Sequence, residues 1–133
     1  MIVVDTNVIG YLYLTGERSG QAEQALRKDP RWAAPLLWRS ELRNVLALYL
    51  RRGHLSPDTA QQIVYEATSL MLGREYNVTS PHVLDLVAAS NCSAYDCEFA
   101  ALALDLGVPL VTVDQQVLHQ FPTTAESLDD FVS

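Results

Sequence analysis

The most informative segment of this sequence is Val108-Pro109-Leu110-Val111-Thr112-Val113-Asp114. It is a short apolar run, rich in β-branched residues, that follows a glycine and ends at an acid, so it predicts a buried strand over residues 108–113. The chain opens on a similar run, Ile2-Val3-Val4, which ends at Asp5. The two runs predict two short interior strands, each followed directly by a carboxylate.

Helical patterns fill most of the chain between these two strands. We expect helices from residue 6 to about residue 14 and over residues 21–28, 36–52, 56–72, 80–89, 94–106, 115–119 and 125–131, with weaker strands at 32–34 and 76–79. Short apolar strands that alternate with amphipathic helices are typical of an α/β sandwich with a mostly parallel sheet. We therefore expect one α/β domain over residues 1–133.

Length and composition restrict the class of protein. A chain of 133 residues with 49% apolar residues can bury a core, which argues against disorder. No apolar run approaches the roughly 20 residues of a membrane span, and the first residues do not resemble a signal peptide, so we expect a cytoplasmic protein without membrane association. Cys92 and Cys97 fit neither a zinc site nor a redox pair, and we expect both to be reduced and buried.

The charges of the chain are segregated. The net charge is −7, although residues 18–52 carry +5 and residues 53–133 carry −10. Such asymmetry suggests a surface for a charged partner. The alternative is that solvated helices simply differ in charge.

Two acids, Asp5 and Asp114, directly follow the two apolar strands. If these strands are parallel, both acids lie at the carboxyl edge of the sheet, where α/β proteins bind ligands. The alternative is that each is only the N-cap of the helix that follows.

Helical phase places two further acids. Glu41 shares a row with Trp38, Val45 and Leu48, and Asp96 shares one with Phe99, Ala100 and Ala103, whereas Glu98 and Asp105 are predicted to point away. An unpaired charge on the packed side of a helix is unfavourable. Glu41 could still be a solvated charge, and Asp96 could be the acidic member of a capping box that begins at Ser93.

Four carboxylates converging on one edge would repel one another, and a divalent cation would resolve that repulsion. Ligation by oxygen alone favours Mg²⁺ or Mn²⁺. Such a site supports phosphoryl chemistry through an activated water, without a side-chain nucleophile. This agrees with the sequence, because His54, His82 and His119 are isolated and no Ser/His/Asp or Cys/His set is present.

These motifs resemble those of a known family. Val3-Val4-Asp5-Thr6-Asn7, Ser40-Glu41-Leu42, Tyr95-Asp96-Cys97-Glu98-Phe99 and Leu110-Val111-Thr112-Val113-Asp114 are similar, in this order, to the four motifs of the PIN domain, and specifically of the VapC toxins of toxin–antitoxin pairs. The four acids are spaced by 36, 55 and 18 residues, and the resemblance covers essentially the whole chain.

The resemblance implies a three-layer α/β/α fold and a Mg²⁺- or Mn²⁺-dependent endoribonuclease, usually a homodimer, that a co-expressed antitoxin silences. It implies that the metal ligands and catalytic residues are Asp5, Glu41, Asp96 and Asp114. Thr6, Asn7 and Thr112 match positions that orient those carboxylates. Arg39 and Arg43 share a helix with Glu41, and we predict that they contact RNA and antitoxin.

Other functions remain open on the sequence alone. A phospho-accepting signalling domain also places an Asp after a parallel strand, but it needs a lysine near the phosphoryl group, and Lys28 lies on a predicted outer helix. A catalytically weak PIN-fold module that binds RNA or protein is a second alternative. A housekeeping RNA-processing nuclease is a third.

Overall fold

A five-stranded sheet forms the centre of the computed structural model, which describes all 133 residues. The strands are β1 (Ile2–Val4), β2 (Trp32–Pro35), β3 (Glu75–Tyr76), β4 (Leu110–Thr112) and β5 (Ala125–Ser127). Their order is β3-β2-β1-β4-β5, and every neighbouring pair is parallel. The predicted mostly parallel sheet is thus confirmed, and the sheet is in fact parallel throughout.

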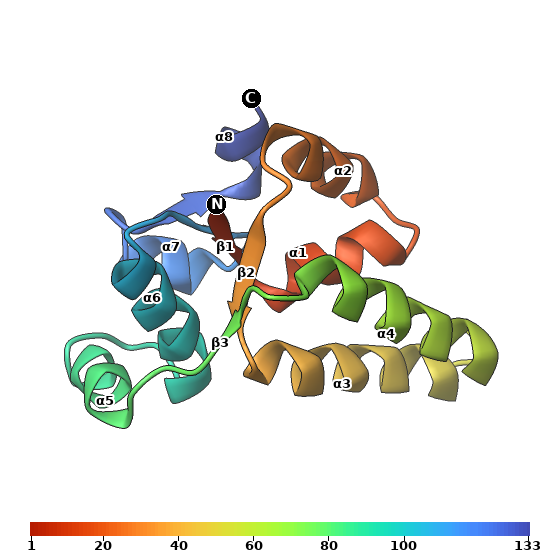
Figure 1. Ribbon diagram of the computed structural model, residues 1–133, viewed down its shortest axis with the longest axis horizontal. Coiled ribbons are helices and arrows are strands. Elements are labelled where there is room, and N and C mark those ends of the chain that lie inside the picture. The colour runs from red at the N-terminus through yellow and green to blue at the C-terminus, as the bar shows by residue number, and fades with distance from the viewer.

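Eight helices cover the sheet. They are α1 (Thr6–Tyr13), α2 (Ser19–Lys28), α3 (Leu37–Arg51), α4 (Pro57–Met71), α5 (Ser80–Ala88), α6 (Ala94–Leu106), α7 (Gln115–Gln120) and α8 (Leu128–Val132). Helices α1–α4 lie on one side of the sheet and α5–α7 on the other, which confirms the three-layer α/β/α architecture (Figure 1). Helices α3 and α4 form a hairpin that extends away from the sheet. None of the eight is at once long enough and apolar enough to cross a bilayer.

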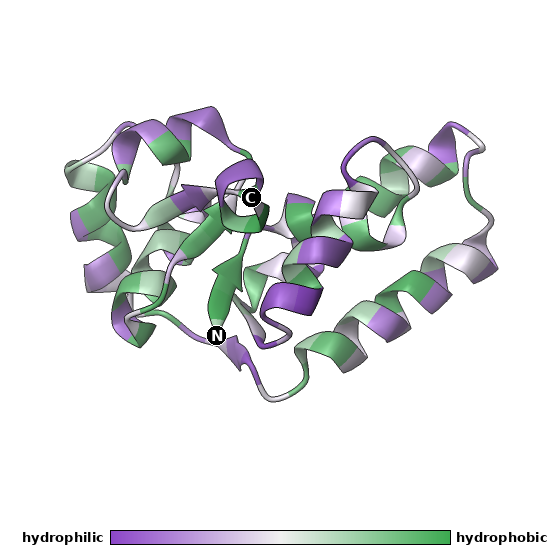
Figure 2. Cartoon of the chain, turned by 90° about the horizontal axis from the view of Figure 1, so that it is seen from above, coloured by the Kyte–Doolittle hydropathy of each residue, from purple (hydrophilic) through white to green (hydrophobic).

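The core lies between the sheet and its helices. Val3, Val4 and Val111 are completely buried in the two central strands, and these strands are among the most hydrophobic segments of the ribbon (Figure 2). Helix α6 is buried along most of its length, because it packs against β1, β2 and β4. Cys92 and Cys97 are free and buried, as predicted.

The sequence prediction was wrong at the C-terminal end of the chain. A helix was expected over residues 125–131, but Ala125–Ser127 pairs with β4 and the helix begins only at Leu128. The Ser127 hydroxyl accepts a hydrogen bond from the Asp130 backbone amide and caps α8. The expected strand over 76–79 is also shorter, since only Glu75 and Tyr76 pair with β2.

Gly107 ends α6 and allows the chain to turn into β4. Its φ of 66° is in the left-handed region, and its amide bonds to the carbonyl groups of Ala103 and Leu104. A Cβ at this position would meet nothing within 4 Å, so a substitution would cost only conformational energy.

We expect Gly107→Ala to lower the free energy of unfolding by about 1–2 kcal/mol, because an alanine resists the left-handed conformation. Urea denaturation measures this change. Gly20→Ala is the matched control, since Gly20 lies in α2 with equally open surroundings and no positive φ. The control should leave the midpoint unchanged or raise it. Equal midpoints for the two variants would contradict this account of the turn.

Candidate active site

The order of the strands creates a crevice at one edge of the sheet. From the central strand β1 the chain builds β2 and β3 on one side, and later adds β4 and β5 on the other. Asp5 follows β1 and Asp114 follows β4 closely, and Val4 is paired with Val111 between them. The two acids therefore lie on either side of the point where the strand order reverses, a usual ligand site in parallel sheets.

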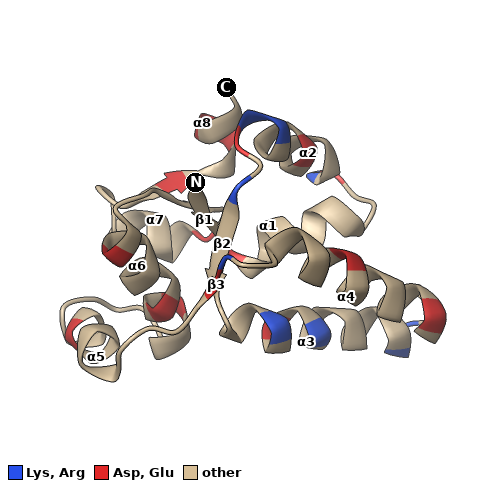
Figure 3. Cartoon of the chain, in the orientation of Figure 1, with Lys and Arg blue, Asp and Glu red and all other residues tan.

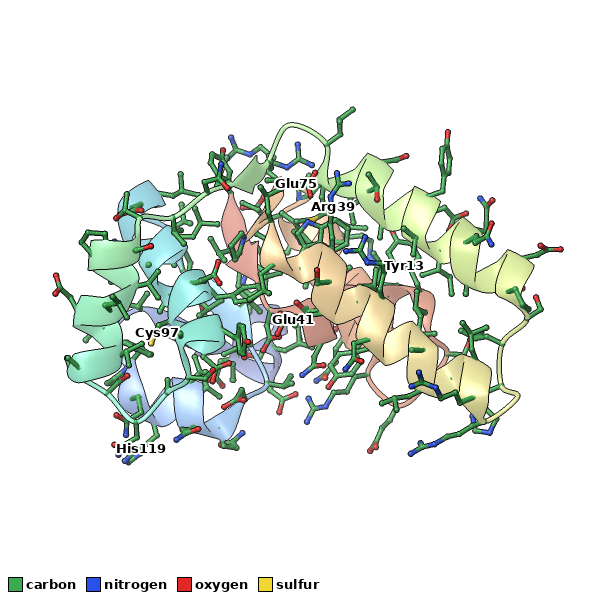
Figure 4. All side chains as sticks on the ribbon, turned by 90° about the horizontal axis from the view of Figure 1, so that it is seen from below. Tyr13, Arg39, Glu41, Glu75, Cys97 and His119 are labelled. Carbon is green, nitrogen blue, oxygen red and sulfur yellow. The ribbon has the colours of Figure 1, made fainter.

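Two helices bring the other acids to the same edge. Helix α3 begins after β2 and carries Glu41 in its second turn, and α6 carries Asp96 in its first turn. All four carboxylates line one cavity of about 500 Å³. Figure 4 places Glu41 near the centre of the molecule, beside the sheet. A smaller space of about 20 Å³ lies against Asp5, Glu41 and Asp96.

Both aspartates that follow strands are also helix caps. Asp5 Oδ1 accepts a hydrogen bond from the Asn7 amide at 3.1 Å, and Asp114 Oδ1 accepts one from the Val117 amide at 3.0 Å. A carboxylate has a second oxygen, so capping does not prevent either residue from facing the cavity. The two interpretations that the sequence left open are therefore compatible.

Two buried threonines hold the carboxylates. The Thr112 hydroxyl donates to Asp5 Oδ2 at 2.6 Å and accepts from the Asp114 amide at 3.0 Å. The Thr6 hydroxyl donates to Glu41 Oε1 at 2.7 Å. Asn7 acts on Asp5 through its backbone amide, and its side chain is exposed at the cavity.

The environment disfavours charge on three of the acids. Burial raises the pKa of Asp5, and nearby Asp114 raises it further, while the hydrogen bonds from Thr112 and Asn7 lower it. Burial likewise raises the pKa of Glu41, with contributions from Asp5 and Asp96. Burial and the charge of Asp114 raise the pKa of Asp96. A proton or a bound cation would relieve this cluster.

The helical phase predicted from the sequence was wrong for Glu98. Its side chain is partly buried, burial raises its pKa, and its charge helps to raise the pKa of Glu41. Glu98 is therefore partly buried rather than turned fully to solvent. Asp105 does point away, and its carboxylate pairs with Nδ1 of His82 at 3.0 Å.

The cations of α3 differ in their availability. Arg39 forms a bidentate pair with Glu75, and the indole of Trp38 donates to the same carboxylate at 2.7 Å (Figure 4). This pair joins α3 to β3. Arg43 is exposed and only contacts the Ser40 hydroxyl at 3.1 Å. Basic residues are concentrated on α2 and α3 (Figure 3).

Sequence reasoning missed two polar residues that line the acidic cavity, Ser40 and Asn44. Asn44 lies three residues after Glu41 on α3, so it falls on the same helical face. That spacing was the available signal. Lys28, the only lysine, lies far from the acids: its ammonium group donates to the Phe131 carbonyl and lies 4.5 Å from the centre of the Phe131 ring.

The donor set is suited to a hard cation, since every candidate ligand is an oxygen. No three of the chain's acidic, histidine or cysteine side chains stand together closely enough to hold one ion. The carboxylates thus line a shared cavity without forming a closed ligand cage.

A family model for the PIN domain matches residues 2–122. The chain belongs to the PIN domain family. A Pyrobaculum aerophilum protein named Ribonuclease VapC3 is 31% identical over 124 residues, which are 91% of this chain and 95% of that protein. The resemblance drawn from the four motifs is thereby confirmed.

Solved structures share this PIN domain's fold. A crystal structure of PAE2754 from Pyrobaculum aerophilum aligns with a TM-score of 0.78 and 19% identity, covering 98% of this chain and 92% of that one. FitAcB from Neisseria gonorrhoeae aligns with a TM-score of 0.74 and 19% identity over 96% and 98%. A toxin–antitoxin complex from Klebsiella pneumoniae aligns with a TM-score of 0.71 and 20% identity over 96% and 98%.

We expect Asp96→Asn to raise the melting temperature of this PIN domain by a few degrees at pH 7 in EDTA. The raised pKa of Asp96 means that the native protein binds its proton more tightly than the unfolded chain does. The free energy of unfolding therefore falls as the pH rises from the pKa of Asp96 in the unfolded chain to its pKa in the native protein. Above the native pKa the full penalty applies. The gain should therefore shrink near pH 4.

Asp85→Asn is the matched control, because Asp85 is exposed on α5 and its side chain has no partner. It should change the melting temperature little at either pH. Thermal unfolding followed by circular dichroism measures both variants. A gain for Asp85→Asn equal to that for Asp96→Asn would show that general charge reduction, not the acid cluster, is responsible.

Proposed function

We propose that this protein is a metal-dependent endoribonuclease and the toxin of a VapBC-type toxin–antitoxin pair, acting in the cytoplasm. The observation that carries the proposal is the cavity where Asp5, Glu41, Asp96 and Asp114 converge at the strand-order reversal. Two of the similar proteins support it: the Pyrobaculum aerophilum relative is named a ribonuclease, and the Klebsiella pneumoniae structure is a toxin–antitoxin complex.

The proposed cofactor is Mg²⁺ or Mn²⁺, bound in the cavity that the four acids line, with water completing the coordination that the carboxylates leave open. The all-oxygen donor set fits such an ion, and the raised pKa values of three of the acids indicate that they lack compensating positive charge. When bound, such an ion lowers the pKa of a water molecule and stabilises charge on phosphate oxygens.

The chain's own residues position these groups. Thr112 and Thr6 fix the carboxylates of Asp5 and Glu41 by hydrogen bonds, so the two side chains keep their orientation when substrate binds. Arg43 is the proposed contact for the RNA backbone or the antitoxin, because its guanidinium is exposed. Arg39 is less suited to this role, since its Nε and Nη2 groups already donate to the Glu75 carboxylate.

The position of Lys28 argues against a phospho-accepting signalling domain. Such a domain needs a cation beside its acids, and Lys28 instead contacts Phe131 on α8. A module that only binds RNA would not require desolvated carboxylates, because desolvation of Asp5, Glu41 and Asp96 weakens the fold without aiding binding.

Purified protein should cleave single-stranded and structured RNA with Mg²⁺ or Mn²⁺, and EDTA should abolish cleavage. Asp5→Asn and Asp96→Asn should each reduce the rate at least about 100-fold, since each removes a ligand of the ion. Gel assays with labelled RNA measure this, and Asp85→Asn should cleave as the parent does. Cleavage that survives EDTA, or active Asp5→Asn protein, would exclude the metal mechanism.

The proposed partner is an antitoxin that wraps the toxin and folds on binding. The positive segment over residues 18–52 would attract acidic stretches of such a partner, and a basic side chain could pair with the carboxylates. We also propose that the protein is a homodimer, as the family resemblance implies.

Expression of the protein alone should arrest bacterial growth, whereas co-expression with the protein encoded next to it should restore growth. The Asp96→Asn variant should be harmless when expressed alone, because the arrest depends on RNA cleavage. Growth curves after induction measure this. A parent protein that cleaves RNA in vitro but does not slow growth would favour a housekeeping RNA-processing enzyme.

A further inference from the structure

A second cavity, of about 400 Å³, adjoins the acid cluster. It lies between α1, the segment that leads into α2, and one face of α3. Thr6, Asn7 and Val45 line both this cavity and the acidic one, so the two cavities are adjacent. Its volume is within the range of small-molecule sites. Neither the proposed metal site nor the carboxylates account for it.

The walls of this second cavity combine flat aromatic surface with polar groups. Tyr11 of α1 and Tyr49 of α3 both line it, and neither hydroxyl has a hydrogen-bond partner within the protein. Both rings and Arg18 line this one cavity, and burial raises the pKa of Tyr11. Val45 lies one turn before Tyr49 and extends the apolar wall.

Arg18 is the only cation that lines this cavity, where it stands beside Glu17 in the sequence, and its side chain is only weakly held. Its guanidinium lies 3.8 Å from Asp129 and 3.3 Å from the Gln21 side chain, and 41% of the side chain is exposed. An exposed ion pair at such a distance stabilises the fold little. A phosphate in the cavity could therefore recruit this guanidinium at small cost.

Gly10 is a glycine without a structural reason. It lies within α1, is not among the glycines with positive φ, and a Cβ there would meet only the Leu14 Cδ1 atom, at 4.0 Å. An alanine would fit and would favour the helix. Because Gly10 lines the cavity, its missing side chain keeps that space open.

From these contacts we infer that the cavity is a nucleotide subsite, in which one unpaired nucleotide next to the cleaved bond places its base against Tyr11 and Tyr49 and its phosphate near Arg18. This inference rests on the proposed function, because it extends the same RNA path beyond the carboxylates. Base–aromatic contact of this kind binds single strands with little preference for sequence. A paired base could not enter the cavity, so the subsite restricts cleavage to unpaired nucleotides, in single strands or in the loops of structured RNA.

A peptide side chain is the less favoured occupant. The cavity adjoins the carboxylates that would cut RNA, and its lining includes one cation and two tyrosines, which matches the phosphate and base of a nucleotide.

Gly10→Ala tests the subsite without weakening the fold. The variant should melt at the parent's temperature or above, yet bind a 12-nucleotide single-stranded RNA about fivefold more weakly in EDTA, where cleavage cannot occur. Fluorescence anisotropy measures the RNA binding. Gly20→Ala is the matched control, because it adds a methyl group to α2 away from the cavity, and it should bind RNA as the parent does.

Arg18→Gln should reduce the salt dependence of binding, whereas Arg27→Gln, on the exposed face of α2, should not.

A second probe separates this inference from the proposed function. The four nucleoside 5′-monophosphates, added in EDTA, should shift the ring resonances of Tyr11 and Tyr49 in the parent but not in Gly10→Ala. Shifts in a parent that never cleaves RNA would overturn the proposed function and support the nucleotide site. RNA cleavage with unchanged Gly10→Ala binding would overturn the subsite alone. A Gly10→Ala protein that cleaves normally but escapes neutralisation by the neighbouring gene product would assign the cavity to that protein and overturn the subsite.

Discussion

The candidate site depends on four carboxylates that the parallel sheet brings together at one edge, where burial removes water from three of them. Strand β1 and strand β4 end side by side, and the helices that start or enter there add Glu41 and Asp96. Burial raises the pKa of three of these acids. The threonine hydroxyls offset part of the penalty, since a hydrogen bond to a charged group contributes about 1.5–3 kcal/mol. The part of the penalty that the hydroxyls do not offset lowers the stability of the native protein. The same part favours the binding of positive charge to the carboxylates.

The acids also serve the fold, which explains why the sheet edge tolerates them. Asp5 and Asp114 each cap a helix with one oxygen, and Ser93 caps α6 just before Asp96. The helix N-termini contribute partial positive charge at the same edge. Asp5 and Asp114 therefore serve both the site and the start of a helix, and removing either carboxylate would change a helix cap as well as a proposed metal ligand.

The fold and most of the site followed from the sequence because both depend on local patterns. Apolar runs that end at Asp5 and Asp114 indicate strand ends, and parallel strands place those ends together. The strand at Ala125–Ser127 was missed because its partly buried residues carry no apolar run, and only pairing with β4 defines it. Glu98 was misplaced because α6 is buried on nearly all sides, so helical phase alone cannot separate an inner from an outer face. The pairing of Arg39 with Glu75 joins residues far apart in sequence, which no local pattern reports.

Several basic side chains are already engaged by groups of the protein itself. Fewer of them are therefore free to contact RNA in the proposed function. Arg39 binds Glu75, Lys28 binds the Phe131 carbonyl, and the Arg74 guanidinium donates to the carbonyl groups of Trp32 and Leu70. The positive segment over residues 18–52 therefore offers fewer free cations than its sequence suggests, since Lys28 and Arg39 are already engaged. Arg18 lines the second cavity, whereas Arg43 lies on the side of α3 that faces α4. In the proposed function, a phosphate near Arg18 would still face the four acids, so a bound cation would have to change the sign of the local field before the RNA backbone approaches. In this arrangement a single event, cation binding, would relieve the repulsion among the carboxylates and admit the substrate.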